Sequence, residues 1–363
     1  TQAGNEGGPG YENSTSNNTN SGNTQSQVSA AAKAAADAIT KPEITSEAGI
    51  LYDVTNGRVL FEKNADEKLA PASTTKLMTA LLVLEKSKLD DKVTFSKTAV
   101  TNLESGAVKI GLVEGDQVSV KDCLYGLLLK SANEVANGLA EHVSGSISAF
   151  ADLMNAKAKE LGCTNTHFVN PNGLNSDQQY TTCRDMAKIA AAAFANQTLC
   201  QIDSTLSYKF PATKAAAART ITPGHKMLYP NDSRYYAGIV GGKTGYTSKA
   251  GNTLVTCVEK DGVRMVAVIL KSKSTHYADT KKMLDYGYQY VNTEKGNTTG
   301  NSTTTTTTAK QETAGKWVQD NGSWRYEFAD GTKAVGTIYT IDAADFGFDP
   351  DGKMVTGWKM FGT

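Results

Sequence analysis

The sequence has little that would tie the protein to a membrane or to nucleic acid. Its longest apolar runs, VAVIL near residue 268 and AAAAFA near residue 193, fall far short of the ~20 residues that a transmembrane helix needs. Lysine plus arginine and aspartate plus glutamate both number 37, so the net charge gives no reason to expect a polyanionic partner. We therefore expect no transmembrane segment and no nucleic acid partner.

Cysteine is scarce as well, and its pattern does not suggest a metal site. The chain has five cysteines, at Cys123, Cys163, Cys183, Cys200 and Cys257. They form no Cys-x-x-Cys pair, and no histidine stands at a metal-ligand interval from them. The odd count leaves at least one thiol unpaired, and the spacing determines no pairing. We interpret the cysteines as small core residues.

Three common catalytic signatures are also missing. The chain contains no Gly-x-Ser-x-Gly, no His-Glu-x-x-His and no glycine-rich phosphate loop. The four histidines are scattered, and we interpret them all as structural: His142, His167, His225 and His276. Neither a metal nor a cofactor is expected.

The N-terminal region differs in composition from the rest of the chain. Residues 1–27 are mostly Gly, Asn, Ser, Thr and Gln, which predicts a disordered spacer because such a segment cannot bury enough apolar surface. Residues 28–39 have high helix propensity and precede Pro42. We interpret 1–43 as a leader with a short helix, and the opening at Thr1 as what remains after an export signal has been removed.

The pattern changes to that of a folded α+β domain over residues 44–291. The strand-like runs AGILYDV and RVLFEK flank Asn56-Gly57, a strong hairpin signal. Apolar periodicity predicts helices at 71–86, 120–130, 133–143, 147–161 and 184–194, and strands at 236–246, 252–258 and 263–270, followed by a last helix. Strands at both ends with helices between them predict one antiparallel sheet covered by helices.

The remainder of the chain is predicted to form a linker and a second module. Residues 292–316 are rich in threonine and lack large apolar side chains, as expected of a tether. In 317–363 an Asp-Gly pair with a lysine within the next two residues and a later Gly recurs after 21 residues, which indicates a small repeat array.

One short motif suggests nucleophilic catalysis. Ser73 and Lys76 stand at i and i+3 near the start of a predicted helix, which places the hydroxyl within hydrogen-bonding reach of the amine. The alternative is a serine that caps the helix and a lysine at the surface. The motif alone leaves both interpretations open.

Two further motifs follow along the chain. Ser131-Ala132-Asn133 comes between two predicted helices, and Lys243-Thr244-Gly245 lies in a strand-like segment after Gly241 and Gly242. Small residues there would let a ligand lie close to the strand edge. The alternative is an edge strand that carries a protective lysine.

The order SxxK, SxN, KTG, spaced by 58 and then 112 residues, resembles the motif set of penicillin-binding proteins and serine β-lactamases. The chain is most similar to the low-molecular-mass D-alanyl-D-alanine carboxypeptidases, through PASTTKLMTALL, SANEVANGLAEHVSGS, FVNPNGL and GGKTGYTSKAGNTLV among other stretches between about residues 44 and 290. The resemblance implies a β-lactamase/DD-peptidase-like fold, an antiparallel sheet flanked by helices.

It also implies a serine mechanism with peptidoglycan stem peptides as substrates. Ser73 would attack the carbonyl of the penultimate D-alanine, and β-lactams would acylate the same hydroxyl. A lysine is charged at neutral pH, so Lys76 can act as base only if burial and the nearby charge of Lys243 depress its pKa.

The other motif residues receive roles by the same resemblance. Ser131 would relay a proton to the leaving D-alanine, and Asn133 would hold the peptide. Lys243 and Thr244 would bind its terminal carboxylate. The backbone amides of Ser73 and of Tyr246, which follows Gly245, would form the oxyanion hole.

Two departures from the β-lactamase pattern bear on how fast the acyl-enzyme is hydrolysed. Ala132 stands where the β-lactamase motif has Asp, and no glutamate occurs between Glu160 and Glu259 to activate water. We expect slow turnover of penicillin. The alternatives are a class A-like β-lactamase and an inactive penicillin-sensing or wall-binding protein, the latter disfavoured because the motif residues are intact.

The C-terminal module resembles choline-binding-type cell-wall repeats. Its candidate ligand-binding aromatics are Trp317, Trp324, Tyr326, Phe328 and Trp358, which could hold a quaternary ammonium group by cation–π attraction. The alternative is that they pack the hairpins together, and choline, wall glycan and no ligand all remain open. The predicted location is extracellular and associated with the cell wall.

Overall fold

A computed structural model describes residues 30–101, 103–296, 315–320, 323–328, 333–334, 338–341, 344–347 and 352–354. The chain divides into two compact units, Thr1–Asn297 and Thr298–Thr363, and each is described by itself. The predicted spacer 1–27 and most of the predicted linker lie outside the described residues.

A five-stranded antiparallel sheet forms the centre of the first unit, with strand order β2-β1-β9-β8-β7. The strands are β1 (Ala48–Asp53), β2 (Arg58–Lys63), β7 (Ile239–Thr247), β8 (Gly251–Lys260) and β9 (Val263–Ser272). The first two form the predicted hairpin across Asn56-Gly57, and β1 pairs with β9 from the other end of the domain. The prediction of one sheet built from both ends is confirmed.

Helices fill the long connection between β2 and β7. They are α2 (Lys76–Lys86), α3 (Lys97–Thr101), α4 (Val120–Leu128), α5 (Asn133–Ser144), α6 (Ile147–Glu160), α7 (Cys183–Phe194) and α8 (Gln197–Asp203), with the 3₁₀ turns η1 (Ala72–Thr75) and η2 (Lys226–Leu228). The predicted helices at α4 to α7 agree within about two residues. The sequence did not predict α3, α8, or the hairpins β3 (Lys92–Thr94) with β4 (Gln117–Ser119) and β5 (Tyr208–Phe210) with β6 (Arg219–Ile221), which are too short to show a period.

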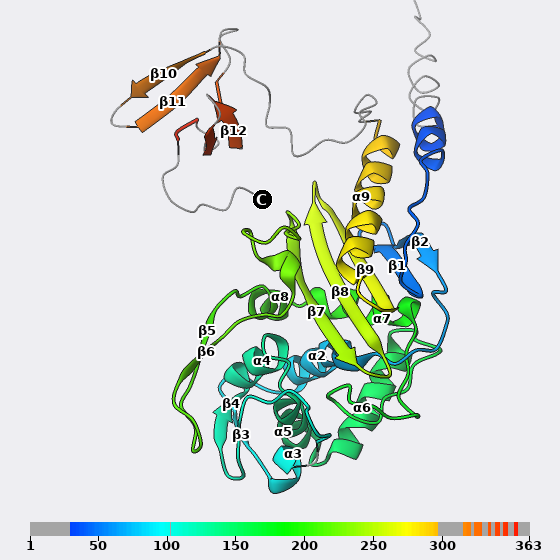
Figure 1. The fold of residues 1–363 in the computed structure, drawn as a ribbon, viewed down its shortest axis with the longest axis vertical. Helices are drawn as coiled ribbons and strands as arrows, with labels where there is room; N and C mark the ends of the chain where they lie inside the picture. Colours follow the sequence, from blue (N-terminus) through cyan, green and yellow to red (C-terminus); the bar gives the residue numbers. More distant parts are fainter. Residues whose placement is uncertain are drawn as a thin grey trace, which may run out of the picture. The chain divides into compact units, whose positions relative to one another are not determined.

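The sheet is covered on both faces (Figure 1). Helix α9 (His276–Glu294) packs on one face, and the helical layer that includes α2 and α7 lies against the other. Along β9, Val266, Val268 and Leu270 belong to the core shared with the helical layer, whereas the alternate residues Met265 and Ala267 belong to the core beneath α9. Burial on both faces explains why this strand reads as a continuous apolar run.

Two predicted boundaries need correction. Residues 30–37 form a helix whose Ala36 is fully buried in the same core as Ile44, so the folded unit begins before residue 44. At the other end, α9 continues to Glu294, whose carboxylate accepts a 2.9 Å hydrogen bond from Arg58 Nη1. Tertiary packing, which composition does not register, therefore extends the domain in both directions.

The second unit contains two hairpins among its described residues. They are β10 (Gly315–Asp320) with β11 (Ser323–Phe328) and β12 (Ile338–Ile341) with β13 (Ala344–Gly347). The linker predicted to reach residue 316 therefore ends earlier, because Gly315 and Lys316 already pair with Phe328 and Glu327.

Of the aromatic residues that are candidates for ligand binding, the structure describes the side chain of Tyr326. Tyr326 is only 6% exposed, which favours the packing alternative for this residue. Trp317 and Trp324 occur in β10 and β11, where the register pairs Trp317 with Tyr326. Their side chains, that of Phe328 and all of Trp358 lie outside the described residues.

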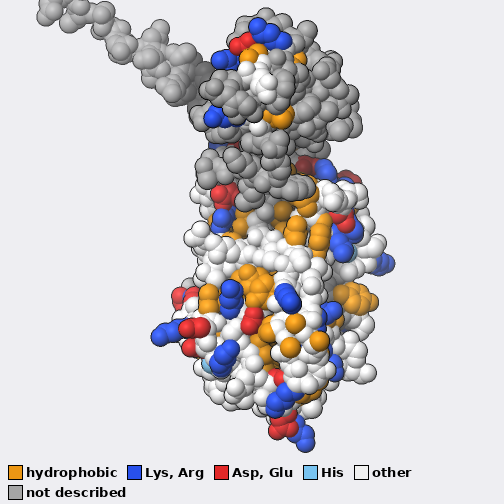
Figure 2. All heavy atoms as spheres, turned by 90° about the vertical axis from the view of Figure 1, so that its left-hand side faces the viewer, with side chains coloured by type: hydrophobic (Ala, Val, Ile, Leu, Met, Phe, Trp, Pro, Cys, Tyr) orange, Lys and Arg blue, Asp and Glu red, His pale blue; other side chains and the backbone are white. Residues whose placement is uncertain are grey.

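No helix in the described ranges combines the length and apolar character needed to cross a bilayer. Figure 2 shows acidic and basic side chains interspersed over the visible face. All five cysteines are free thiols, and three of them are buried.

Candidate active site

The first motif lies in a tight turn against the sheet. Pro71 precedes η1, Ala72 adopts φ +50°, and Ser73 sits inside this 3₁₀ turn. Neither η1 nor α2 receives a side-chain cap at its N-terminus. The capping interpretation of Ser73 is therefore wrong: its hydroxyl is hydrogen-bonded to Lys76 Nζ at 2.8 Å.

Lys76 begins α2 and is fully buried, which contradicts the surface-lysine alternative. Besides Ser73, its Nζ donates to Asn133 Oδ1 at 2.8 Å and to the carbonyl of Asn172 at 2.6 Å. The orientation of the Asn133 amide is set by its Nδ2, which donates to the carbonyl of Val108 at 3.0 Å. Lys76 is thus held by one side-chain amide and one backbone carbonyl.

This geometry has a consequence for the protonation state of Lys76. A neutral amine has two N–H groups and one lone pair. Asn133 Oδ1 and the Asn172 carbonyl can only accept, so a neutral Lys76 uses both N–H groups on them. Its lone pair is then left for the hydroxyl proton of Ser73, which is the arrangement of a nucleophile and its general base.

The electrostatic environment favours this neutral form. Burial depresses the pKa of Lys76 well below its usual value, and the positive charge of Lys243 lowers it further, against a smaller opposing effect of Glu134. Glu134 is fully buried, and its Oε1 accepts hydrogen bonds from the amides of Ile110 and Gly111 at 2.7 and 2.8 Å.

The second and third motifs meet at another hydrogen bond. Ser131 lies between α4 and α5 with φ +60°, and its Oγ accepts from Lys243 Nζ at 3.0 Å. The Lys243 ammonium also donates to the carbonyl of Thr244 at 2.8 Å and is only 2% exposed. Burial lowers its pKa to about 8, while the charge of Asp203 acts in the opposite direction.

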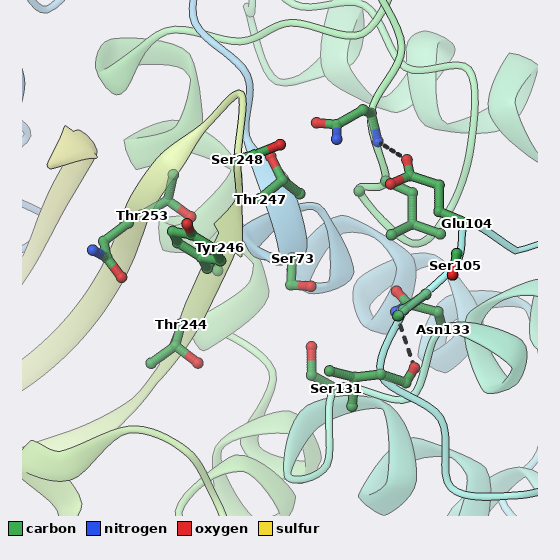
Figure 3. A pocket seen from close by; sticks show the side chains of 18 of the residues that line it. Ser73, Glu104, Ser105, Ser131, Asn133, Thr244, Tyr246, Thr247, Ser248 and Thr253 are labelled. Atoms are coloured by element: carbon green, nitrogen blue, oxygen red, sulfur yellow. Dashed lines mark hydrogen bonds between the residues drawn. The ribbon is translucent and has the colours of Figure 1, made fainter. Parts of the chain in front are cut away.

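These residues surround a cleft of about 500 Å³ (Figure 3). Ser73, Ser131, Asn133, Thr244 and Tyr246 all line it, as does Gly245, whereas the two buried lysines lie beneath. Figure 3 shows Ser73 between the β7 residues on one side and Ser131 and Asn133 on the other. All predicted catalytic and substrate-binding residues therefore come together at one place.

The edge of β7 faces this cleft with free amide positions. The amide of Gly242 points away from β8, because it donates to Asp203 Oδ2 at 2.6 Å. Antiparallel pairing alternates, and the register from Gly241 to Thr247 is unbroken, so the amides of Thr244 and Tyr246 also point to the open side. A Cβ on Gly245 would lie 2.8 Å from the amide nitrogen of Ser73, so β7 and the Ser73 turn are in direct contact.

The glycines before Lys243 have a different purpose from the one predicted. A Cβ on Gly241 would lie 2.6 Å from Asp203 Oδ2, and one on Gly242 would lie 2.6 Å from the ring of His225. At Gly242 the carbonyl oxygen of Val255 is closer still, at 2.3 Å. The small residues thus make room for parts of the protein itself, among them the two buried side chains.

Several site residues were missed by sequence reasoning. Glu104 lines the cleft, and its Oε1 accepts from the amide of Asn175 at 2.7 Å. His276 lines it too, although it was interpreted as structural. Asn172 contributes through its backbone, which no side-chain motif reveals, and only the FVNPNGL stretch that contains it gave a signal.

Comparison with known proteins agrees with this geometry. The family described as D-alanyl-D-alanine carboxypeptidase matches residues 34–274. The chain is 35% identical over 258 residues to D-alanyl-D-alanine carboxypeptidase DacF of Bacillus subtilis (strain 168). This alignment covers 68% of this chain and 63% of DacF. The chain therefore spans less than two thirds of the length of this relative.

A relative and a solved structure, both from Streptomyces K15, match this chain over most of their own length. The chain is 35% identical to the D-alanyl-D-alanine carboxypeptidase of this strain, over 70% of this chain and 90% of the relative. The crystal structure of the Streptomyces K15 DD-transpeptidase superposes with a TM-score of 0.62 at 32% identity, covering 69% of this chain and 99% of that one.

Proposed function

The chain belongs to the D-alanyl-D-alanine carboxypeptidase family, and we propose that it is a serine carboxypeptidase that removes the terminal D-alanine from peptidoglycan stem peptides. The observation that carries the proposal is the environment of Lys76. Two pure acceptors take its N–H groups, and the remaining position is directed at the Ser73 hydroxyl. Burial in the same place lowers its pKa, which keeps the base neutral.

The acylation step follows from this arrangement. Ser73 Oγ attacks the carbonyl carbon of the penultimate D-alanine, and its proton passes to Lys76 Nζ. The oxyanion forms between the amides of Ser73 and Tyr246, which are positioned before the reaction begins. A proton delivered through Ser131 lets the amine of the terminal D-alanine leave as the C–N bond breaks, and an ester remains on Ser73.

The charged end of the substrate fits the other lysine. Lys243 and Thr244 bind the terminal carboxylate of the peptide, and Lys243 also donates to Ser131 along the proton path. Asn133 has both ends of its amide occupied by Lys76 and by the Val108 carbonyl. We therefore assign Asn133 to holding Lys76, and the second N–H of its Nδ2 remains for the predicted contact with the peptide.

Water completes the cycle by hydrolysing the ester. Glu104 is the one carboxylate among the described residues that line the cleft, and one of its oxygens holds the amide of Asn175. A free carboxylate placed to activate water, as a class A-like β-lactamase needs, is therefore not evident in the described cleft. This favours the carboxypeptidase over the β-lactamase alternative, and the intact Lys76 network disfavours an inactive sensor.

The location and the second unit belong to the same proposal. The protein acts outside the cell, where its substrate is, with a catalytic domain that ends before a linker and a C-terminal repeat module that attaches it to the wall. Choline or wall glycan is the proposed ligand of that module. Retention on choline-substituted resin that free choline abolishes supports the choline form, and passage of the protein through the resin rules that form out.

The decisive experiment compares the protein with its Ser73→Ala variant on a stem pentapeptide and on a fluorescent penicillin. We expect release of D-alanine and covalent labelling from the parent and neither from the variant. Ser207→Ala changes an exposed serine and should behave as the parent. A parent that labels without releasing D-alanine, or releases it only with an amine acceptor, is not a carboxypeptidase, and a parent that does neither lacks the acyl-enzyme chemistry altogether.

A further inference from the structure

Two buried ionisable side chains lie on either side of the strand just before Lys243. Asp203, the last residue of α8, is 1% exposed, and His225, which precedes η2, is buried as well. They occupy the two places that the missing side chains of Gly241 and Gly242 leave open. The acylation mechanism uses neither of them.

Asp203 is anchored to the strand by one strong contact. Its Oδ2 accepts the 2.6 Å hydrogen bond from the amide of Gly242, the residue next to Lys243. This occupies the first open amide of the β7 edge and leaves the amides of Thr244 and Tyr246 for the ligand. The strand edge is therefore held from within the protein at the point where the ligand-binding part begins.

Lys243 is a buried cation whose hydrogen-bond partners are neutral. Its ammonium donates to the Ser131 hydroxyl and the Thr244 carbonyl, and in the described part of the chain no carboxylate forms an ion pair with it. A buried, unpaired ammonium tends to lose its proton. The nearby carboxylate of Asp203 opposes this loss.

We propose, on the basis of the function proposed above, that Asp203 is a positioning residue that keeps Lys243 protonated for binding the substrate carboxylate. It acts through the strand, because its carboxylate fixes the backbone of Gly242, the residue next to the lysine. Burial raises the pKa of Asp203 itself to about 7, so its negative charge is present in the alkaline range in which Lys243 titrates. Lys76 also has a buried carboxylate nearby, Glu134, but the effect of Glu134 is smaller than those of burial and of the Lys243 charge, so Lys76 stays neutral. In the same cleft, Lys76 is therefore neutral and Lys243 is positively charged.

The other groups near Asp203 do not supply the same charge. Cys200 on α8 and Cys257 on β8 are close enough to feel it, and burial raises the pKa of both thiols, so they stay neutral. Arg264 on β9 is paired with Glu259 and donates to the Phe194 carbonyl. Burial lowers the pKa of His225 to about 3, so it adds no charge above that pH.

A purely structural role for Asp203 makes a different prediction. If the residue only accepts the amide of Gly242, an asparagine would serve as well, because its Oδ1 accepts the same hydrogen bond. Asp203→Asn therefore separates the charge from the contact. Asp203→Ser is a second uncharged variant with more room beneath Gly241, and Cys200→Ala is the matched control on the same helix.

The test is the pH profile of D-alanine release from the pentapeptide, with kcat and KM measured separately and penicillin labelling as a second readout. We expect both uncharged variants to move the alkaline limb of kcat/KM at least about one pH unit lower. At pH 8, which is close to the pKa of Lys243 in the parent, a shift of one unit is roughly a fivefold loss, mostly as a higher KM, while Cys200→Ala keeps the parent profile.

Each outcome decides one question. An Asn or Ser variant with the parent's alkaline limb and KM overturns the role of Asp203 while leaving the enzyme assignment intact. The same is true if kcat alone falls with an unshifted profile. A parent protein that neither releases D-alanine nor labels with penicillin overturns the proposed function, and the inference with it.

Discussion

The substitution Gly173→Ala probes how tightly the Ser73 turn is enclosed. Gly173 has φ +90°, and a Cβ there would lie 1.9 Å from the carbonyl oxygen of Ala72 and 3.0 Å from the amide nitrogen of Ser73. Both obstacles are backbone atoms, which cannot rotate away. The loop of residues 170–175 would have to withdraw from the nucleophile turn.

The size of the effect can be worked from these contacts. Bringing the Cβ from 1.9 Å to at least 3.0 Å from the Ala72 oxygen requires a movement of about 1.1 Å. The loop also supplies the Asn172 carbonyl, whose 2.6 Å bond to Lys76 would then exceed the ~3.2 Å limit of a good hydrogen bond. Left-handed backbone in alanine costs ~1–2 kcal/mol and overpacking a further ~1–3 kcal/mol, and a misplacement of this size can slow the reaction ~100-fold.

The assay measures the rate of penicillin labelling and the free energy of unfolding in urea. Gly162→Ala is the control, because Gly162 has φ +77° but only the flexible end of Lys188 within 4 Å, at 3.8 Å. It should lose about 1–2 kcal/mol of stability and label at the parent rate. If Gly173→Ala labels as fast as the parent and is no less stable than Gly162→Ala, the loop does not hold Lys76 in place.

Three further predictions follow from the cleft. A plot of the penicillin labelling rate against pH should be bell-shaped. The rate should fall on the acid side as Lys76 gains a proton, and above about pH 8 as Lys243 loses one. A rate that stays constant between pH 5 and 10 contradicts the proposal that Lys76 is neutral and Lys243 charged. Glu134→Ala should lower stability by about 2–4 kcal/mol in urea, because the amides of residues 110 and 111 lose their buried acceptor, and a loss below 1 kcal/mol would show that water replaces it. Purified protein should hydrolyse nitrocefin slowly after a stoichiometric burst, whereas sustained fast hydrolysis would identify a β-lactamase.

The sheet was predictable because its signals are local. Asn56-Gly57 specifies the first hairpin, and the run at 263–270 is apolar throughout because both of its faces are covered. Short elements were not predictable, since α3 and α8 have five and seven residues and span fewer than two helical turns. The extension of the domain to residue 30 depends on burial of Ala36 against distant residues, which composition does not reveal.

The site was predictable to the extent that it consists of motif side chains. Three spaced motifs identified Ser73, Lys76 and Lys243, and the fold brings them together as expected. The motifs could not predict contacts made by backbone groups or by residues from distant parts of the chain. Examples are the hydrogen bond from Lys76 to the Asn172 carbonyl and the hydrogen bond from the Gly242 amide to Asp203. Asp203 lies in a short helix far along the chain from either lysine, and nothing in its local sequence marks it.

The two lysines show why this distinction matters for mechanism. Both are buried, and an equal charge on both would leave the enzyme without either a base or a carboxylate receptor. The difference comes from the charges around them. The positive charge of Lys243 lowers the pKa of Lys76, against a smaller opposing effect of Glu134, whereas Asp203, which binds the strand residue next to Lys243, opposes proton loss from Lys243. Because a positive Lys243 lowers the pKa of Lys76, a group that keeps Lys243 charged helps to keep the base neutral. Asp203 therefore affects the nucleophile without touching it.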